Sequence, residues 1–390
     1  RFRGEVARAG ASELRGEPAP VNGSVYDVVK ERHAPELPGR GAAATQEIAL
    51  VNPRAPQVHL LSGSEWMLAV SDSGAGVSVC RGLDMTMHSG DLLRRPQGVF
   101  AILDGGEGAF SLTRAPDLTA HENHRVSFGD GYAAFYADKG VLSAGLRVLV
   151  HPRLPGEQRQ LVVQNRSPEL KEVRVLFYFE PCLTRREDSE AHPAFSRLFL
   201  SARREECAGA VLVTRRQRGE EPPLCLAAGF LEDVPFVYEA SREALLARPV
   251  GTASLLGTMD APLSDQGNGV PDVGIALRAV LSLPPKGKQA LTFVLTAAPT
   301  EGEAVTRLIE MRREGRLTAA NAAKSPFGGV EAQLAAQILP DLFYPPRMSR
   351  EWAQAARENT RGQAALWPLG ISGDYPIVLI EVHNAAVACR

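Results

Sequence analysis

The stretch that decides the fold runs from Arg125 to Val150 and reads RVSFGDGYAAFYADKGVLSAGLRVLV. It contains three runs rich in β-branched and aromatic residues, separated by the short sequences Gly129–Gly131 and Asp138–Gly140. Runs of this kind bounded by Gly and Asp are typical of strands joined by tight turns, because glycine supplies the positive φ angle that a tight hairpin needs. The stretch therefore predicts an antiparallel meander.

The same pattern continues on both sides of this stretch. Four shorter runs precede it, at 66–70, 77–80, 99–103 and 109–112, and six follow it, at 160–164, 173–179, 210–214, 224–231, 275–283 and 291–297. Two large antiparallel sheets packed face to face would bury that many half-apolar strands, whereas a seven-stranded immunoglobulin-type sandwich would be too small. The sequence therefore predicts a large, mainly β fold with some α-helix.

The apolar period becomes helical near residue 300. Thr300 and Glu303 have the spacing of a capping box, and apolar residues follow at helical intervals. A second helix is predicted at 330–339, closed by Pro340, and a third at 349–359. The predicted organisation is a lead segment at 1–55, a β-sandwich at 56–299, a helical linker at 300–365 and the start of a further domain at 366–390.

Composition excludes several classes of protein. The chain has 390 residues, with 43 Lys and Arg against 45 Asp and Glu, and no clustered basic face, so nucleic acid is not expected as a partner. No run approaches the roughly 18 apolar residues that span a bilayer. The five cysteines lie far apart, which favours reduced thiols and a cytoplasmic location. The chain begins at Arg1 and ends at Arg390 inside an apolar run, so we expect it to be part of a longer protein.

Two local sequences are candidates for a functional site. In the first, His192 precedes Pro193, which favours an extended backbone and a loop from which the imidazole projects toward a pocket. The alternative, which local sequence favours, is that the histidine only stabilises a connection.

The second candidate is the turn at 366–376, LWPLGISGDYP. Gly370 and Gly373 let the backbone approach a ligand, Asp374 can accept paired hydrogen bonds from sugar hydroxyls beside Ser372, and the Trp367 ring can stack on a sugar face. The alternative is a turn whose aspartate caps local N–H groups. Neither candidate contains a metal-binding pattern, and no metal or other cofactor is expected.

Taken in order, these motifs resemble the glycoside phosphorylase family 94, formerly glycosyltransferase family 36, and above all the phosphorylase-like modules of cyclic β-1,2-glucan synthases. The matching stretches are His59–Gly63, Val70–Gly76, Arg81–Leu83, Ala191–Phe199, Ala210–Arg216, Glu220–Pro223, Asn359–Gln363, Leu366–Trp367 and Gly370–Leu379. The resemblance covers residues 56–382 and implies a galactose-mutarotase-like β-supersandwich, linker helices and the beginning of an (α/α)₆ catalytic barrel.

The resemblance also implies a chemistry. Family enzymes invert the anomeric centre: phosphate attacks C1 while one carboxylic acid protonates the leaving oxygen. That general acid is expected beyond residue 390, so this chain is expected to hold no catalytic residue. The resemblance places Asp374, with Ser372 and Gly373, at the donor-sugar subsite. A sugar-contacting arginine of some phosphorylases has no clear match, and Arg361 is the nearest basic residue.

These expectations lead to one principal hypothesis and two alternatives. The chain is expected to be the carbohydrate-binding sandwich and linker of a β-glucan-processing enzyme, inactive alone, whose parent uses inorganic phosphate as co-substrate. The first alternative is a non-catalytic carbohydrate-binding or assembly module of a larger glucan synthase; the second, a polysaccharide lyase, is disfavoured by the sandwich-first order. A β-glucan oligosaccharide is the expected partner. A homodimer is expected by resemblance, and the parent is expected to reach the inner membrane only through other domains.

Overall fold

The computed structural model describes residues 46–48, 51, 55–117, 122–217, 222–246, 251–267, 272–344, 350–373 and 377. The chain divides into two compact units, one spanning Arg40–Pro346 and the other combining Arg1–Gly39 with Arg347–Arg390. Of the lead segment only residues 46–48, 51 and 55 are described, and Asp374 lies outside the described residues.

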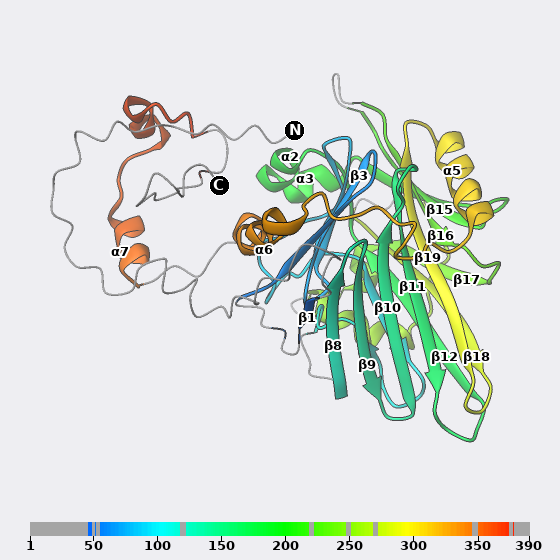
Figure 1. Cartoon of the computed structure of the whole chain (residues 1–390). Coiled ribbons are helices and arrows are strands. Elements are labelled where there is room, and N and C mark those ends of the chain that lie inside the picture. Colours follow the sequence, from blue (N-terminus) through cyan, green and yellow to red (C-terminus); the bar gives the residue numbers. More distant parts are fainter. Residues whose placement is uncertain are drawn as a thin grey trace. The chain divides into compact units, whose positions relative to one another are not determined.

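The larger unit is built on three antiparallel sheets, and Figure 1 shows strands β8 to β11 of the largest one side by side. The nine-stranded sheet has the order β1 (Gln46–Ile48), β8 (Glu122–Gly129), β9 (Tyr132–Lys139), β10 (Leu142–Val150), β11 (Gly156–Asn165), β19 (Lys288–Ala298), β16 (Cys225–Phe230), β15 (Ala210–Arg215) and β14 (Leu200–Glu205). One five-stranded sheet has the order β17 (Phe236–Ser241), β18 (Val273–Leu283), β12 (Lys171–Phe179), β6 (Phe100–Asp104) and β7 (Phe110–Ser111). The other has the order β13 (Pro181–Thr184), β5 (Leu83–Thr86), β4 (Gly76–Cys80), β3 (Trp66–Ser71) and β2 (Val58–Ser62).

The predicted meander is confirmed, but the prediction of two sheets is wrong. Strands β8, β9 and β10 pair in sequence order, as their turns require. Strands β2 to β5 pair with one another as consecutive hairpins and then with β13, so they form a sheet of their own. Apolar side chains from all three sheets share one core, in which Phe293 stacks on Phe177 with ring centroids 4.8 Å apart.

Helices occupy the excursions and the region after the sandwich. They are α2 (Arg186–Ala191), α3 (Pro193–Arg197), α4 (Arg242–Leu245), η1 (Gly251–Met259), α5 (Glu301–Glu314) and α6 (Gly329–Phe343) in the larger unit, and α7 (Arg350–Glu358) and η2 (Gln363–Leu369) in the other. The predicted cap of α5 is confirmed, because the Thr300 side chain accepts from the Glu303 N–H at 3.2 Å. Pro340 does not end α6, which continues to Phe343. No described helix is both long and apolar enough to span a membrane.

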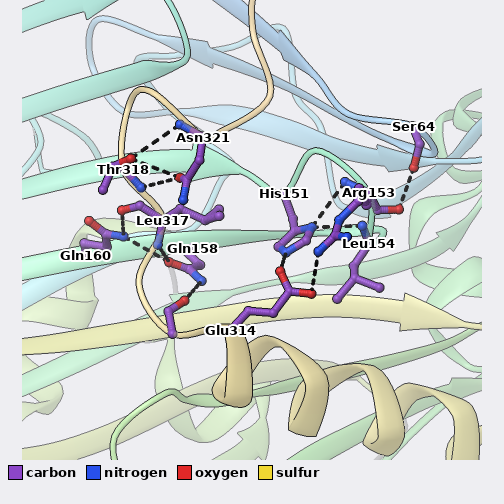
Figure 2. A network of polar contacts seen from close by, with 11 residues as sticks. Ser64, His151, Arg153, Leu154, Gln158, Gln160, Glu314, Leu317, Thr318 and Asn321 are labelled. Atoms are coloured by element: carbon purple, nitrogen blue, oxygen red, sulfur yellow. Dashed lines mark hydrogen bonds and ion pairs between the residues drawn. The ribbon is translucent and has the colours of Figure 1, made fainter.

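Helix α5 and the segment after it cover part of the outer face of the nine-stranded sheet. Leu308 and Met311 of the helix pack on Val294 of β19. Beyond the helix, Gln158 Nε2 donates to the Gly315 carbonyl at 2.9 Å, and Gln160 Nε2 donates to the Leu317 carbonyl at 2.8 Å. Figure 2 shows these amides reaching from β11 to the crossing segment. The sheet therefore holds residues 315–317 through side chains instead of through a strand ladder.

A neutral histidine fixes the end of the same helix (Figure 2). His151 Nδ1 accepts from the N–H groups of Leu154 at 2.9 Å and Arg153 at 3.2 Å, so the other ring nitrogen carries the proton and donates to Glu314 at 3.0 Å. Burial lowers the pKa of His151. Burial acts to raise the pKa of Glu314, but its contacts with His151 and Arg153 outweigh that effect and lower it. The helix end thus depends on one imidazole tautomer.

One buried carboxylate connects all three sheets. Glu157 of β11 accepts from Trp66 Nε1 of β3 at 3.1 Å and from Ser78 Oγ of β4 at 2.6 Å. Its second oxygen pairs with Arg159 at 2.8 Å, and Arg159 Nη1 donates to the carbonyl of Val99, the residue before β6. Glu157 and Arg159 are 0% and 2% exposed. This network supplies the hydrogen bonds that a buried ion pair needs.

Glu157→Gln should lower the free energy of unfolding by about 3–5 kcal/mol, because it leaves the Arg159 charge buried without a counterion. Urea denaturation of the purified chain measures the loss. The exposed pair of Glu65 and Arg81, at 2.9 Å, is the matched control, and Glu65→Gln should cost less than about 1 kcal/mol. Adding Arg159→Met to Glu157→Gln should recover part of the loss, and equal losses for Glu157→Gln and Glu65→Gln would contradict the assignment.

Candidate functional site

The sequence-predicted site residues fall into different parts of the structure. His192 belongs to the larger unit, between α2 and α3. Arg361, Trp367, Ser372 and Gly373 belong to the other unit, around η2. The structure therefore brings the η2 group together along one short segment, and His192 belongs to the other of the two units.

The Gly-rich turn has a defined backbone. Helix η2 ends at Gly370, whose φ of 74° is left-handed and whose N–H donates to the Trp367 carbonyl at 2.9 Å. Gly373 also has a φ of 74°, and a Cβ there would lie 3.0 Å from side-chain atoms of Gln363 and Leu366. Both glycines are therefore required by local geometry. The expectation that they let the backbone approach a ligand stays a prediction.

Gln363 holds the turn closed, and the sequence reading gave it no role. Its Nε2 donates to the Ser372 carbonyl at 2.8 Å, which joins the first residue of η2 to the residue before Gly373. The Ile371 N–H donates to the Leu366 carbonyl at 3.2 Å and closes the same loop from inside. The signal available in the sequence was its place in the Asn359–Gln363 stretch. A side-chain contact to a carbonyl nine residues later has no signature of its own.

Two side chains of this segment face water. The Trp367 side chain is 63% exposed, and an exposed indole offers a flat apolar surface on which the C–H face of a sugar can lie. The Arg361 backbone is clamped by Asn359, whose Oδ1 accepts from the Arg361 N–H at 3.0 Å and whose Nδ2 donates to its carbonyl at 3.2 Å. The arginine is exposed. The segment thus presents an aromatic ring and a cation around a constrained turn.

His192 is exposed and links two short helices instead of lying in an extended loop. Its backbone φ and ψ are −143° and 71°, and Pro193 is the first residue of α3. The Ser196 N–H donates to the His192 carbonyl at 2.9 Å. The excursion at 181–200 therefore folds as a strand and two helices. The local reading in which this histidine belongs to a connection agrees with these contacts.

Arg197, in the same excursion, contacts a buried carboxylate of the sandwich. No role was assigned to this arginine from the sequence. Arg197 Nη2 donates to Glu180 at 2.6 Å, and Arg242 of α4 donates to the same oxygen at 2.9 Å. The other Glu180 oxygen accepts from the Tyr178 hydroxyl at 3.0 Å and from Gln97 at 3.1 Å. Burial, followed by the charge of Glu180, raises the pKa of Tyr178. The network anchors α3 and α4 to the sandwich.

Comparisons with known proteins place the sandwich in a family. Residues 46–314 match the model of the glycosyl hydrolase 94 supersandwich domain. Because the match covers more than half of the chain, the chain belongs to the glycosyl hydrolase 94 family. The resemblance predicted from the motifs and the mainly β supersandwich fold are both confirmed.

A curated relative resembles almost the whole chain. The cyclic beta-(1,2)-glucan synthase NdvB of Rhizobium meliloti (strain 1021) is 26% identical over 407 aligned residues, which cover 98% of this chain and 14% of NdvB. The chain therefore spans a small part of that relative.

Solved structures match more distantly. A bacterial glucoamylase complexed with acarbose has 9% identity and a TM-score of 0.40, covering 78% of this chain and 38% of the glucoamylase. A putative aldose 1-epimerase from Escherichia coli K12 has 11% identity and a TM-score of 0.36, covering 62% of this chain and 98% of the epimerase.

Gln363→Met should loosen the turn, because it keeps the side-chain length but removes the N–H donor to the Ser372 carbonyl. Amide exchange of Gly370 and Ile371, followed by NMR, should accelerate by roughly three- to tenfold, as expected for a net hydrogen-bond contribution of about 1 kcal/mol. Gln354→Met on α7 removes a comparable amide, which donates to Glu358 at 2.8 Å, and should leave these two amides unchanged. Unchanged exchange in Gln363→Met would show that the amide does not hold the turn.

Proposed function

We propose that this chain is the supersandwich and linker of a carbohydrate-active enzyme that processes β-glucans, of the inverting glycoside phosphorylase or cyclic β-1,2-glucan synthase type. The family match over 46–314 is the observation that carries the proposal. The relative's printed name, a cyclic beta-(1,2)-glucan synthase, supports the choice of substrate class. The proposed partner is a β-glucan oligosaccharide, and the proposed location is the cytoplasm.

In this proposal the chain contributes binding rather than chemistry. The parent's reaction is attack of inorganic phosphate on C1 of the terminal sugar, while a carboxylic acid outside this chain protonates the departing glycosidic oxygen. The products are a sugar 1-phosphate of inverted configuration and a glucan shorter by one unit. Asp374, beside Ser372 and Gly373, accepts hydrogen bonds from donor-sugar hydroxyls, and Trp367 stacks on a sugar ring.

The constrained turn supports this division of labour. A carboxylate selects between sugar hydroxyls only when its backbone is held in one geometry, because a mobile side chain pays conformational entropy on binding. Gly370, Gly373 and the Gln363 amide hold the backbone up to the residue before Asp374. Arg361 is proposed to lie at the rim of the same subsite. We assign no glucan contact to His192, whose described contacts belong to the connection between α2 and α3.

Trp367→Ala should weaken binding of a β-1,2-glucan oligosaccharide to the chain by about tenfold or more, because a stacked ring contributes about 1.4 kcal/mol or more to affinity. Isothermal titration calorimetry measures the change. Trp352 of α7 is the matched control, since its side chain is 59% exposed in the same unit, and Trp352→Ala should bind like the wild type. Equal losses for the two variants would remove Trp367 from the proposed subsite.

An assay of the parent protein distinguishes between the two candidate functions, an enzyme and a binding module. With β-1,2-glucan and inorganic phosphate, the parent should release glucose 1-phosphate, and Asp374→Ala should reduce that release by at least about tenfold. Glucan binding without release of the sugar phosphate would favour the second candidate, a non-catalytic binding or assembly module of a larger glucan synthase. The near-complete coverage of this chain by a small part of a glucan synthase favours keeping that candidate.

A further inference from the structure

The end of α6 is docked on the sandwich through its last residue, Phe343, and the residue that follows it, Tyr344. Phe343 and Tyr344 are 9% and 5% exposed, and both pack in the core cluster that contains Ala69 and Val77. His88 lies against both rings, with centroids 5.8 Å from Phe343 and 5.7 Å from Tyr344. The neutral imidazole donates from Nε2 to the Phe343 carbonyl at 2.9 Å. This contact ties the last helical turn to the segment after β5.

A buried carboxyl group faces the same tyrosine from the β3–β4 hairpin. Asp72 is 1% exposed, and among the described residues no hydrogen bond of good geometry reaches either of its carboxylate oxygens, although backbone N–H groups of the hairpin and of Gln57 lie near them. The next residue back in the hairpin, Ser71, forms a hydrogen bond with the Tyr344 hydroxyl. An ionised carboxylate is costly in such a place, because these weak contacts replace only part of the hydration that it loses. The geometry therefore favours a protonated Asp72 when α6 is docked.

The surroundings of Asp72 and His88 shift both pKa values toward the uncharged forms. Burial raises the pKa of Asp72 to about 7, and nearby backbone N–H groups and Arg114 only partly oppose it. Burial, together with the charge of Arg186, lowers the pKa of His88 to about 4. Arg186 itself pairs with Asp84 at 3.0 Å and lies over the Phe343 ring at 5.6 Å. Both groups that face Tyr344 are thus held neutral, one as an acid and one as a base.

We propose that docking of the end of α6 requires Asp72 and His88 to be uncharged together, so that docking moves one proton from the imidazole to the carboxyl group. When the end lifts and water reaches both groups, the carboxyl ionises and the imidazole takes up a proton. When it docks again, the imidazolium N–H bond breaks and a carboxyl O–H bond forms. No proton is gained or lost overall.

The pH dependence follows from the pKa values in the two states. In the proposed undocked state, where water reaches both groups, Asp72 and His88 return to their ordinary pKa values of 3.8 and 6.5; in the docked structure burial moves these values to about 7 and about 4. Asp72 alone would weaken docking as the pH rises from 3.8 to about 7, because only the docked state holds the proton. His88 alone would weaken docking as the pH falls from 6.5 to about 4. Between pH 4 and 6.5 the two effects cancel, and docking is independent of pH.

Hydrogen exchange of the Tyr344 amide tests this compensation, because that N–H donates to the Pro340 carbonyl at 2.8 Å only while the last turn is formed. After correction for intrinsic rates, the wild-type opening constant should be flat between pH 4.5 and 6.5. In Asp72→Asn it should rise about tenfold for each pH unit downward, and in His88→Gln about tenfold for each unit upward. The double variant should be flat again.

Asp138→Asn is the matched control, since Asp138 is a buried carboxylate held by Asn123 and Arg166 away from α6, and the exchange of Tyr344 should keep its flat profile. Flat profiles in both single variants, or slopes of the same sign, would overturn the proposal. Should either variant fail to fold, NMR titration of the wild type decides. A His88 ring that titrates near pH 6.5, or an Asp72 carboxyl that titrates near pH 4, overturns the proposal; displaced titrations of both groups support it.

Discussion

The ion pair between Glu157 and Arg159 is the contact on which the sandwich depends. Each of the three sheets buries at least one apolar face, and such faces can slide over one another without losing much hydrophobic energy. A buried carboxylate cannot slide, because moving it leaves a charge without a partner. By accepting from Trp66 and Ser78 and pairing with the arginine that reaches Val99, Glu157 fixes the register of all three sheets. The network around Glu180 does the same for α3 and α4.

Local features of the fold could be predicted from the sequence, and long-range ones could not. The meander around Gly129–Gly131 and the Thr300 cap depend on residues a few positions apart, so their signals are complete within a short window. The separation into three sheets depends on which distant strands pair, and strand periodicity does not report this. Pro340 was expected to end α6, yet docking of Phe343 and Tyr344 extends the helix past it.

The candidate site shows the same division. Gly370 and Gly373 predict a tight turn by residue type alone, and both have a left-handed backbone in the structure. The amide of Gln363 that closes the turn could not be recognised from the sequence, because glutamine occurs in many structural roles. The candidate residue that the sequence indicates in the excursion at 181–200 is His192. The residue that contacts the buried carboxylate of Glu180 is Arg197. Sequence motifs therefore identified the segments that form the turn and the excursion, but not the side chains that hold them in place.

The amides of Gln158 and Gln160 have a consequence for how this chain can change over evolutionary time. They hold the segment after α5 by its carbonyl groups, which every amino acid possesses. These two hydrogen bonds therefore do not depend on which side chains stand at 315–317. Substitutions at 315–317 leave these two hydrogen bonds in place, although Gly315, with a φ of 80°, and the buried Leu317 are constrained by other features of the fold. Part of the selection that maintains the path of this connection therefore acts on Gln158 and Gln160 of β11, outside the connection itself.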